Sequence, residues 1–156
     1  MKLYLGFKWT KNFIYVFVCS YKWNYTLVSN EPIKIEDHLK NLKESLEVIE
    51  ESIEKGLLER QRNIGFNTSA ACADMLEILL HKKDLIDPGF IIKHEWLKSK
   101  NKIIEKFPFN FPNKKEILDL TYKIEEKRDI LCYGKPQKIE IINEVLENFN
   151  TKWQDE

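Results

Sequence analysis

The stretch LKNLKESLEVIEESI, residues 39–53, carries the clearest structural signal in this 156-residue chain. Its leucines and isoleucines stand at positions 39, 42, 46, 49 and 53, at intervals of three and four residues. Residues at this spacing lie on one side of an α-helix, because the helix turns about once every 3.6 residues. The stretch therefore predicts an amphipathic helix that begins near Ile35 and ends at Gly56, since glycine favours a helix end.

Two further helices are predicted directly after Gly56. The first covers about residues 61–80 and combines apolar residues with alanines on most of its surface, so we expect it to be the most buried element. Asp87 and Pro88 then fit the start of a third helix, with Asp87 as N-cap and Pro88 in the first turn. Its inner face is predicted at Ile92, Trp96, Ile103 and Phe107.

The last third of the chain predicts two more helices. Asn113 followed by Glu116 fits a capping box, which opens a helix that runs to about Cys132. Pro136 restarts a fifth helix, with apolar residues at helical spacing as far as Trp153. Short loops join these elements, so the predicted fold is all-α: an up-and-down bundle of about five helices.

Residues 1–34 differ in composition from the rest of the chain, because Tyr, Phe, Trp and Val are concentrated there. Such side chains favour strands, so one interpretation is a two-stranded β-hairpin that turns near residues 21–24. The other interpretation is a mis-assigned translation start, in which case the segment is not native. We therefore divide the chain into an aromatic-rich appendage, residues 1–34, and a helical domain, residues 35–156, and assign no function to the appendage.

Composition limits the classes of function. The charges of the 25 basic and 25 acidic residues cancel. The chain therefore lacks the overall positive charge that would indicate binding to nucleic acid. The longest apolar run, residues 13–19, is far too short to cross a membrane. Three widely spaced cysteines indicate reduced thiols and a cytoplasmic protein. The five glycines form no phosphate-binding loop, so no cofactor is expected.

A metal site is not predicted either. His38 and His81 stand near the ends of predicted helices, where we expect them to face solvent. His94 and Glu95 begin like a zinc-protease H-E-x-x-H motif, but Lys98 occupies the position of the second histidine. Scattered histidines without a convergent carboxylate pattern do not indicate a metal centre.

Arg128 is the strongest candidate for a functional residue. It follows Ile117 by eleven residues, about three helical turns, and so lies on the apolar stripe of its predicted helix. A cation on such a stripe needs a partner, because burying it unpaired is costly. One interpretation is that its stem covers apolar surface while the guanidinium pairs with Glu125 or Asp74. The other is a binding role for Arg128 in a dimer, supported by Asp129, an anion placed unfavourably at a helix C-terminus.

The order of elements resembles the HEPN family. A long helix, a glycine turn, an alanine-rich helix and an arginine-containing helix ending in Tyr133-Gly134 follow one another between Ile35 and Trp153. HEPN domains are small all-α domains, often encoded beside minimal nucleotidyltransferases. The resemblance implies a homodimer in which this arginine faces its symmetry mate.

Active HEPN ribonucleases are similar to one another in an arginine, a polar residue directly after it, and a histidine a few residues further on. Arg128 and Asp129 match the first two, whereas Tyr133 occupies the histidine position. A tyrosine hydroxyl titrates near about pH 10 and is a poor general base at neutral pH. The resemblance therefore implies a non-catalytic interaction module that binds a nucleotidyltransferase-type partner, a nucleotide or RNA through Arg128, Asp129 and Tyr133. The alternative is a toxin-type, metal-independent ribonuclease that uses Arg128 and Asp129.

Overall fold

The computed structural model describes residues 33–150, and residues 1–32 and 151–156 lie outside the described part. The described part forms six helices and no strand. They are α2 (Ile35–Lys55), α3 (Gln61–Lys82), α4 (His94–Leu97), α5 (Lys100–Lys106), α6 (Lys114–Cys132) and α7 (Ile139–Asn150). The all-α prediction is thus confirmed, while the predicted hairpin and Trp153 fall outside the described residues.

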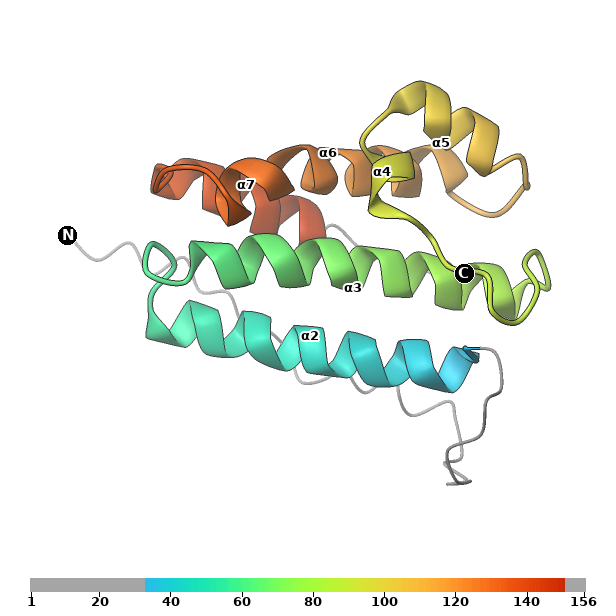
Figure 1. The fold of residues 1–156 in the computed structure, drawn as a ribbon, viewed down its shortest axis with the longest axis horizontal. Coiled ribbons are helices and arrows are strands. Elements are labelled where there is room, and N and C mark those ends of the chain that lie inside the picture. The colour runs from blue at the N-terminus through green and yellow to red at the C-terminus, as the bar shows by residue number, and fades with distance from the viewer. Residues whose placement is uncertain (1–32, 151–156) are drawn as a thin grey trace. The chain divides into compact units, whose positions relative to one another are not determined.

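Helix α3 forms the centre of the bundle (Figure 1). It packs against α2 on one side and against α6 and α7 on the other. Its side chains from Ala71 to Leu80 are all buried, which confirms the prediction that this helix is the most buried element. Because α3 is enclosed, its polar side chains must find partners on the helices that cover it.

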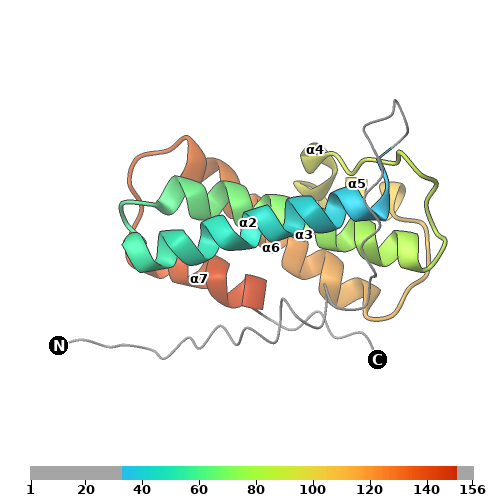
Figure 2. The same cartoon turned by 90° about the horizontal axis from the view of Figure 1, so that it is seen from below.

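Helix α2 confirms the periodic stripe. Leu39, Leu42, Leu46 and Ile49 are buried against α3, and charged residues cover the opposite face. Gly56 directly follows the helix with a φ of 111°, a conformation that a side chain rarely adopts. The connection to α3 is therefore short, and the two helices run antiparallel (Figure 2).

The predicted third helix, from Asp87 to Phe107, is wrong. The chain instead makes a turn at Pro88-Gly89, in which the Phe90 N–H donates to the Asp87 carbonyl at 3.1 Å. Gly89 has a φ of 86° there, outside the helical region. Helical structure begins only at His94, so the segment that leads to α4 runs along α3 instead of forming a helix of its own.

A second break separates α4 from α5. Ser99 lies in an extended conformation and accepts a hydrogen bond from the Lys102 N–H at 3.5 Å, as an N-cap does. The inner positions predicted for the single helix are still buried at Ile92, Ile103 and Phe107. The apolar pattern therefore identified what is buried but not the backbone that buries it.

Helices α6 and α7 complete the bundle. The predicted start of α6 is confirmed at Lys114, but the predicted capping box is wrong: Asn113 has a left-handed φ of 53°, whereas an N-cap residue is extended. The Gln61 side-chain oxygen accepts a hydrogen bond from the Gln137 N–H at 2.9 Å, which ties the α6–α7 connection to the start of α3. Among the described residues, no helix combines the length and apolar character needed to span a membrane.

Candidate functional site

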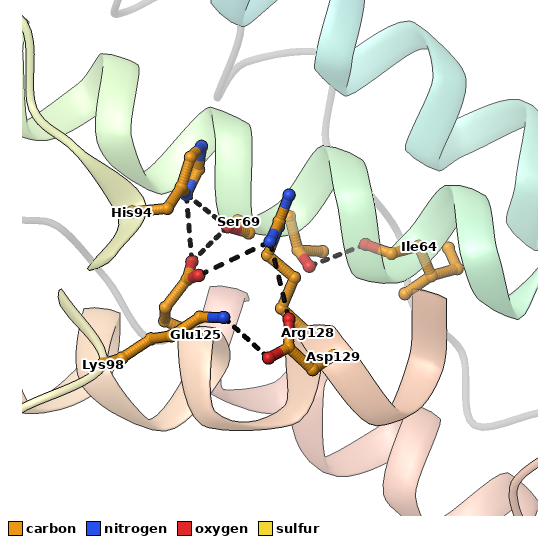
Figure 3. Close-up of polar contacts among 8 residues, drawn as sticks. Ile64, Ser69, His94, Lys98, Glu125, Arg128 and Asp129 are labelled. Atoms are coloured by element: carbon orange, nitrogen blue, oxygen red, sulfur yellow. Dashed lines mark hydrogen bonds and ion pairs between the residues drawn. The ribbon is translucent and has the colours of Figure 1, made fainter. Parts of the chain in front are cut away.

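Arg128 lies on the penultimate turn of α6 with its side chain 17% exposed (Figure 3). Its guanidinium is 3.9 Å from Glu125 Oε1 and 3.6 Å from Asp129 Oδ1. It also lies 5.2 Å above the centre of the Phe66 ring of α3, a cation–π contact. Of the two partners predicted for Arg128, Glu125 is therefore confirmed. The other, Asp74 of α3, instead pairs with His38 of α2.

Glu125 connects Arg128 to two residues from other helices. Its side chain is only 1% exposed, and a carboxylate at that depth needs hydrogen bonds or a cation. Ser69 of α3 donates its hydroxyl to Glu125 Oε2 in a short hydrogen bond. His94 of α4 places its Nδ1 3.1 Å from the same oxygen, so one carboxylate holds serine, histidine and arginine together. We call these four residues the open cluster.

The geometry around His94 fixes the orientation of its ring. Nδ1 lies 3.0 Å from Ser69 Oγ and 3.1 Å from Glu125 Oε2. A carboxylate at Nδ1 favours the tautomer with the proton on that nitrogen, which leaves Nε2 as an acceptor. The side chain of His94 is 37% exposed, whereas that of His38, the other histidine with an ion pair in the described residues, is 4% exposed.

A serine nucleophile is excluded at this site. In a catalytic triad the serine bonds to one ring nitrogen and the acid to the other. Here Ser69 and Glu125 both face Nδ1 of His94, and Ser69 is almost completely buried. Ser69 therefore orients the other two side chains and cannot attack a substrate.

Asp129 has two cationic neighbours. Lys98 Nζ lies 2.6 Å from Asp129 Oδ2, and the Arg128 guanidinium lies 3.6 Å from Oδ1. An anion at a helix C-terminus is unfavourable, because the carbonyl ends of the helix are also negative. These two cations offset that repulsion and explain how Asp129 is accommodated at the end of α6.

Tyr133 directly follows α6 and is 66% exposed. Its ring meets that of Phe66 edge-on, with ring centres 5.5 Å apart, and the guanidinium of Arg128 also contacts the Phe66 ring. The three residues predicted from the sequence, Arg128, Asp129 and Tyr133, are thus neighbours in the structure. Ile130, on the same helix end, is also exposed.

A second polar cluster lies between α2 and α3, and it corrects the prediction for His38. His38 is buried, with its Nδ1 3.0 Å from Asp74 Oδ1 and 2.8 Å from Glu77 Oε2. The ring of His81 lies 5.8 Å from that of His38, and its Nε2 is buried as well. The prediction that His38 faces solvent is therefore wrong, whereas His81 is half-buried. We call His38, Asp74 and Glu77 the enclosed cluster.

Burial and pairing act in opposite directions on the enclosed cluster. Burial alone lowers the pKa of His38, but the hydrogen bonds and charges of Asp74 and Glu77 outweigh it and raise that pKa to about 9. Burial raises the pKa of Asp74, against the opposing effect of His38. Burial also lowers the pKa of His81, and the charge of His38 lowers it further.

The described cysteines are buried thiols. Burial raises the pKa of Cys72 strongly and that of Cys132 to about 11. A thiol with a raised pKa carries little thiolate at neutral pH and is a poor nucleophile. Neither cysteine therefore contributes to the chemistry of the open cluster.

The sequence did not identify Ser69, His94 and Lys98 as members of this site. Ser69 lies among small residues that indicate close packing, and His94 was placed inside a helix that does not form. Glu125 was named from the sequence as a partner of Arg128, which it precedes by three residues on the same helix face. Comparison with protein-family models, curated proteins and solved structures found no significant match to this chain.

Proposed function

We propose that residues 35–156 form a HEPN-like interaction module that acts as a homodimer and binds RNA or a nucleotide through the face that carries Arg128. A nucleotidyltransferase-type protein is the other partner that the family resemblance implies. The observation that carries the proposal is the position of Arg128, which is anchored on Phe66 and beside Glu125 while part of its side chain stays open.

The guanidinium retains donors for a ligand. Its distances to Glu125 and Asp129, 3.9 and 3.6 Å, are longer than direct hydrogen bonds. Arginine carries five N–H donors that match the oxygens of a phosphate in pairs. Because packing on Phe66 already restricts the side chain, binding loses less conformational entropy than it would for a mobile arginine.

The surroundings of Arg128 suit both RNA and a second copy of the chain. Tyr133 is exposed beside the Arg128–Phe66 pair, and aromatic rings of this kind stack on unpaired bases. Ile130 and Tyr133 together expose apolar surface at the same helix end. Interfaces between proteins are enriched in aromatic residues and arginine at their centre, so the same face fits a dimer.

The test compares Arg128→Ala with Arg60→Ala, which removes the same charge from an exposed position at the start of α3. We expect Arg128→Ala to weaken binding of a labelled mixed-sequence single-stranded RNA about tenfold or more, equivalent to about 1.4 kcal/mol. Arg60→Ala is expected to change it less than about twofold, and fluorescence anisotropy measures both. Equal affinities in the two variants would exclude the proposed site, and a monomeric mass in light scattering would exclude the homodimer.

A second candidate function is a metal-independent ribonuclease, and His94 is the observation that favours it. The histidine missing from the position of Tyr133 has a spatial counterpart in His94, which shares Glu125 with Arg128. In this candidate, Nε2 of His94 accepts the proton of a ribose 2′-hydroxyl, whose oxygen attacks the adjacent phosphorus while Arg128 stabilises the charge on the phosphate. The bond from phosphorus to the 5′-oxygen breaks, and that oxygen takes a proton from water. Glu125 and Ser69 orient the imidazole.

The second candidate is tested by incubating the full chain with a mixed RNA pool in EDTA. Cleavage by the wild type that is lost in both His94→Gln and Arg128→Ala supports the ribonuclease. A helical circular dichroism spectrum in the same buffer shows that each protein is folded during the assay. RNA that stays intact with the folded wild type contradicts the ribonuclease and leaves the interaction module.

A further inference from the structure

The enclosed cluster brings three ligand atoms of two chemical types to one point. His38 contributes a ring nitrogen from α2, and Asp74 and Glu77 contribute carboxylate oxygens from one turn of α3. These three atoms lie within 4.8 Å of one another. Asp74 and Glu77 are three residues apart, which places both carboxylates on the face of α3 that α2 covers.

The charges of the enclosed cluster do not balance by themselves. Two carboxylates face a single imidazole, which supplies at most one positive charge. Within the described part of the chain, neither carboxylate pairs with a lysine or arginine. A residual negative charge in a buried site is costly, since few solvent dipoles reach it. A divalent cation with the two carboxylates and a neutral imidazole gives a neutral site.

The second coordination sphere of such a site is already in place. The Ile92 N–H donates to Glu77 Oε1 in a short hydrogen bond, so that Oε2 points to His38. Metal-binding side chains are commonly fixed by hydrogen bonds of this kind.

We propose that His38, Asp74 and Glu77 bind one divalent transition-metal ion, with Zn²⁺ as the best match. One imidazole with two carboxylates supplies ligands that Zn²⁺ accepts in tetrahedral geometry. Metal–ligand distances of about 2.0 Å separate tetrahedral ligand atoms by about 3.3 Å. The present spacings of 2.8 and 3.0 Å need to open by only a few tenths of an ångström. The ion replaces the proton on His38 Nδ1, which passes to solvent.

The ion would act as a clamp between α2 and α3. The ligands come from two helices that pack along their length, and they leave little space for a substrate because His38 and Glu77 are almost completely buried. The site is also separate from the open cluster, which lies between α3, α4 and α6. Metal binding is therefore independent of the function proposed for Arg128.

The test starts with the full-length chain, freed of any histidine tag, treated with chelator and dialysed into metal-free buffer. Zn²⁺ titration by calorimetry is expected to show one site per chain with micromolar or tighter affinity, and to raise the melting temperature. In proton–nitrogen NMR spectra of the histidine rings, the signals of His38 should shift on Zn²⁺ addition while those of His94 do not. This readout uses the wild type and needs no variant to fold.

A matched pair of variants locates the site. Glu77→Gln removes a ligand charge from the enclosed cluster, and Glu47→Gln makes the same change on the exposed face of α2. We expect Glu77→Gln to bind Zn²⁺ at least about a hundredfold more weakly and Glu47→Gln to bind as the wild type does. The proposal is overturned if the wild type binds no Zn²⁺ at micromolar concentration, if the shifted ring is His94 instead of His38, or if both variants retain the wild-type affinity.

Discussion

The open and enclosed clusters use the same chemistry at different depths. Each contains a deeply buried glutamate, Glu125 or Glu77, and a histidine that faces it through Nδ1. The histidine side chains differ in access: that of His94 is 37% exposed, and that of His38 is 4% exposed. Exposure decides what such a pair can do, because a ligand reaches the first and only a bare ion reaches the second. The enclosed cluster is thus expected to govern stability, and the open cluster to govern binding.

The largest expected effect follows from His38→Ala. The substitution leaves the carboxylates of Asp74 and Glu77 buried without their cation, and breaking a buried pair in this way costs about 3–5 kcal/mol. His94→Ala makes the same substitution in the open cluster, where solvent reaches the vacated space. We expect it to cost only about 1 kcal/mol. Urea unfolding followed by circular dichroism measures both changes.

A different order of the two losses in unfolding free energy would contradict the contrast between the clusters. If His94→Ala destabilised the fold as much as His38→Ala, the open cluster would be a structural element as well, and its role in binding would lose support. The comparison is made in chelator, so that a metal ion does not contribute to either value.

The stability of the metal-free protein is expected to fall as the pH rises from about 6.5 to about 9. The raised pKa of His38, about 9, means that the folded state holds a proton that the unfolded chain releases near its ordinary pKa of 6.5. The stabilisation that His38 contributes is therefore complete below about pH 6.5 and is lost as the pH approaches about 9, its pKa in the folded state. The titratable groups around the His38 ring are Asp74 and Glu77 of α3, which face it, and His81, which lies beside it.

The measurement is urea unfolding in chelating buffer at intervals between about pH 6 and about pH 9.5. His38→Gln is the control, because its amide cannot titrate. The stability difference between wild type and variant should narrow across this window, and a constant difference would show that His38 does not carry the raised pKa. Protonation of His81, whose pKa is lowered by burial, adds a separate loss of stability on the acid side.

An intermediate effect is expected for Gly65→Ala, which tests how the open cluster is built. A Cβ at this position would lie 2.8 Å from Leu131 Cβ and 2.9 Å from Cys132 Sγ, so α3 and α6 must separate. Overpacking of this kind costs about 1–3 kcal/mol, and the better helix propensity of alanine returns about 1 kcal/mol. We expect a net loss of about 0–2 kcal/mol in the free energy of unfolding measured with urea, together with weaker RNA binding because the end of α6 carries Arg128. A more stable Gly65→Ala protein would show that the two helices do not need their present close approach.

Helix positions were readable from the sequence where the signal is local and periodic. The stripe of α2 and the burial of α3 follow from spacing along one helix, which needs no knowledge of the partner. The same phase could have placed His38, because it precedes the buried Leu42 by one turn. The prediction that His38 faces solvent was wrong because it gave more weight to the position near a helix end than to the helical phase.

The clusters themselves depend on contacts that no local pattern encodes. His94 reaches Ser69 across 25 residues and Glu125 across 31. Its position depends on the turn at Pro88-Gly89, which replaces the predicted helix by a segment that runs along α3. Arg128 was identified for the opposite reason: a cation on an apolar stripe conflicts with a rule that operates within a single helix.

The smallest effect should come from Lys98→Ala, at the rim of the open cluster. Lys98 and Asp129 form a 2.6 Å ion pair, but their side chains are 39% and 54% exposed. Solvent and salt screen such pairs, which contribute about 0–1 kcal/mol. We expect a change in unfolding free energy of less than about 0.5 kcal/mol, in line with Lys123→Ala, which breaks a comparably exposed pair with Asp119 on the outer side of α6. A loss above about 1.5 kcal/mol would mean that Lys98 holds α4 against α6, and thereby His94 against Glu125. The stability of the open cluster would then depend on the exposed Lys98–Asp129 pair as much as on the buried carboxylate of Glu125.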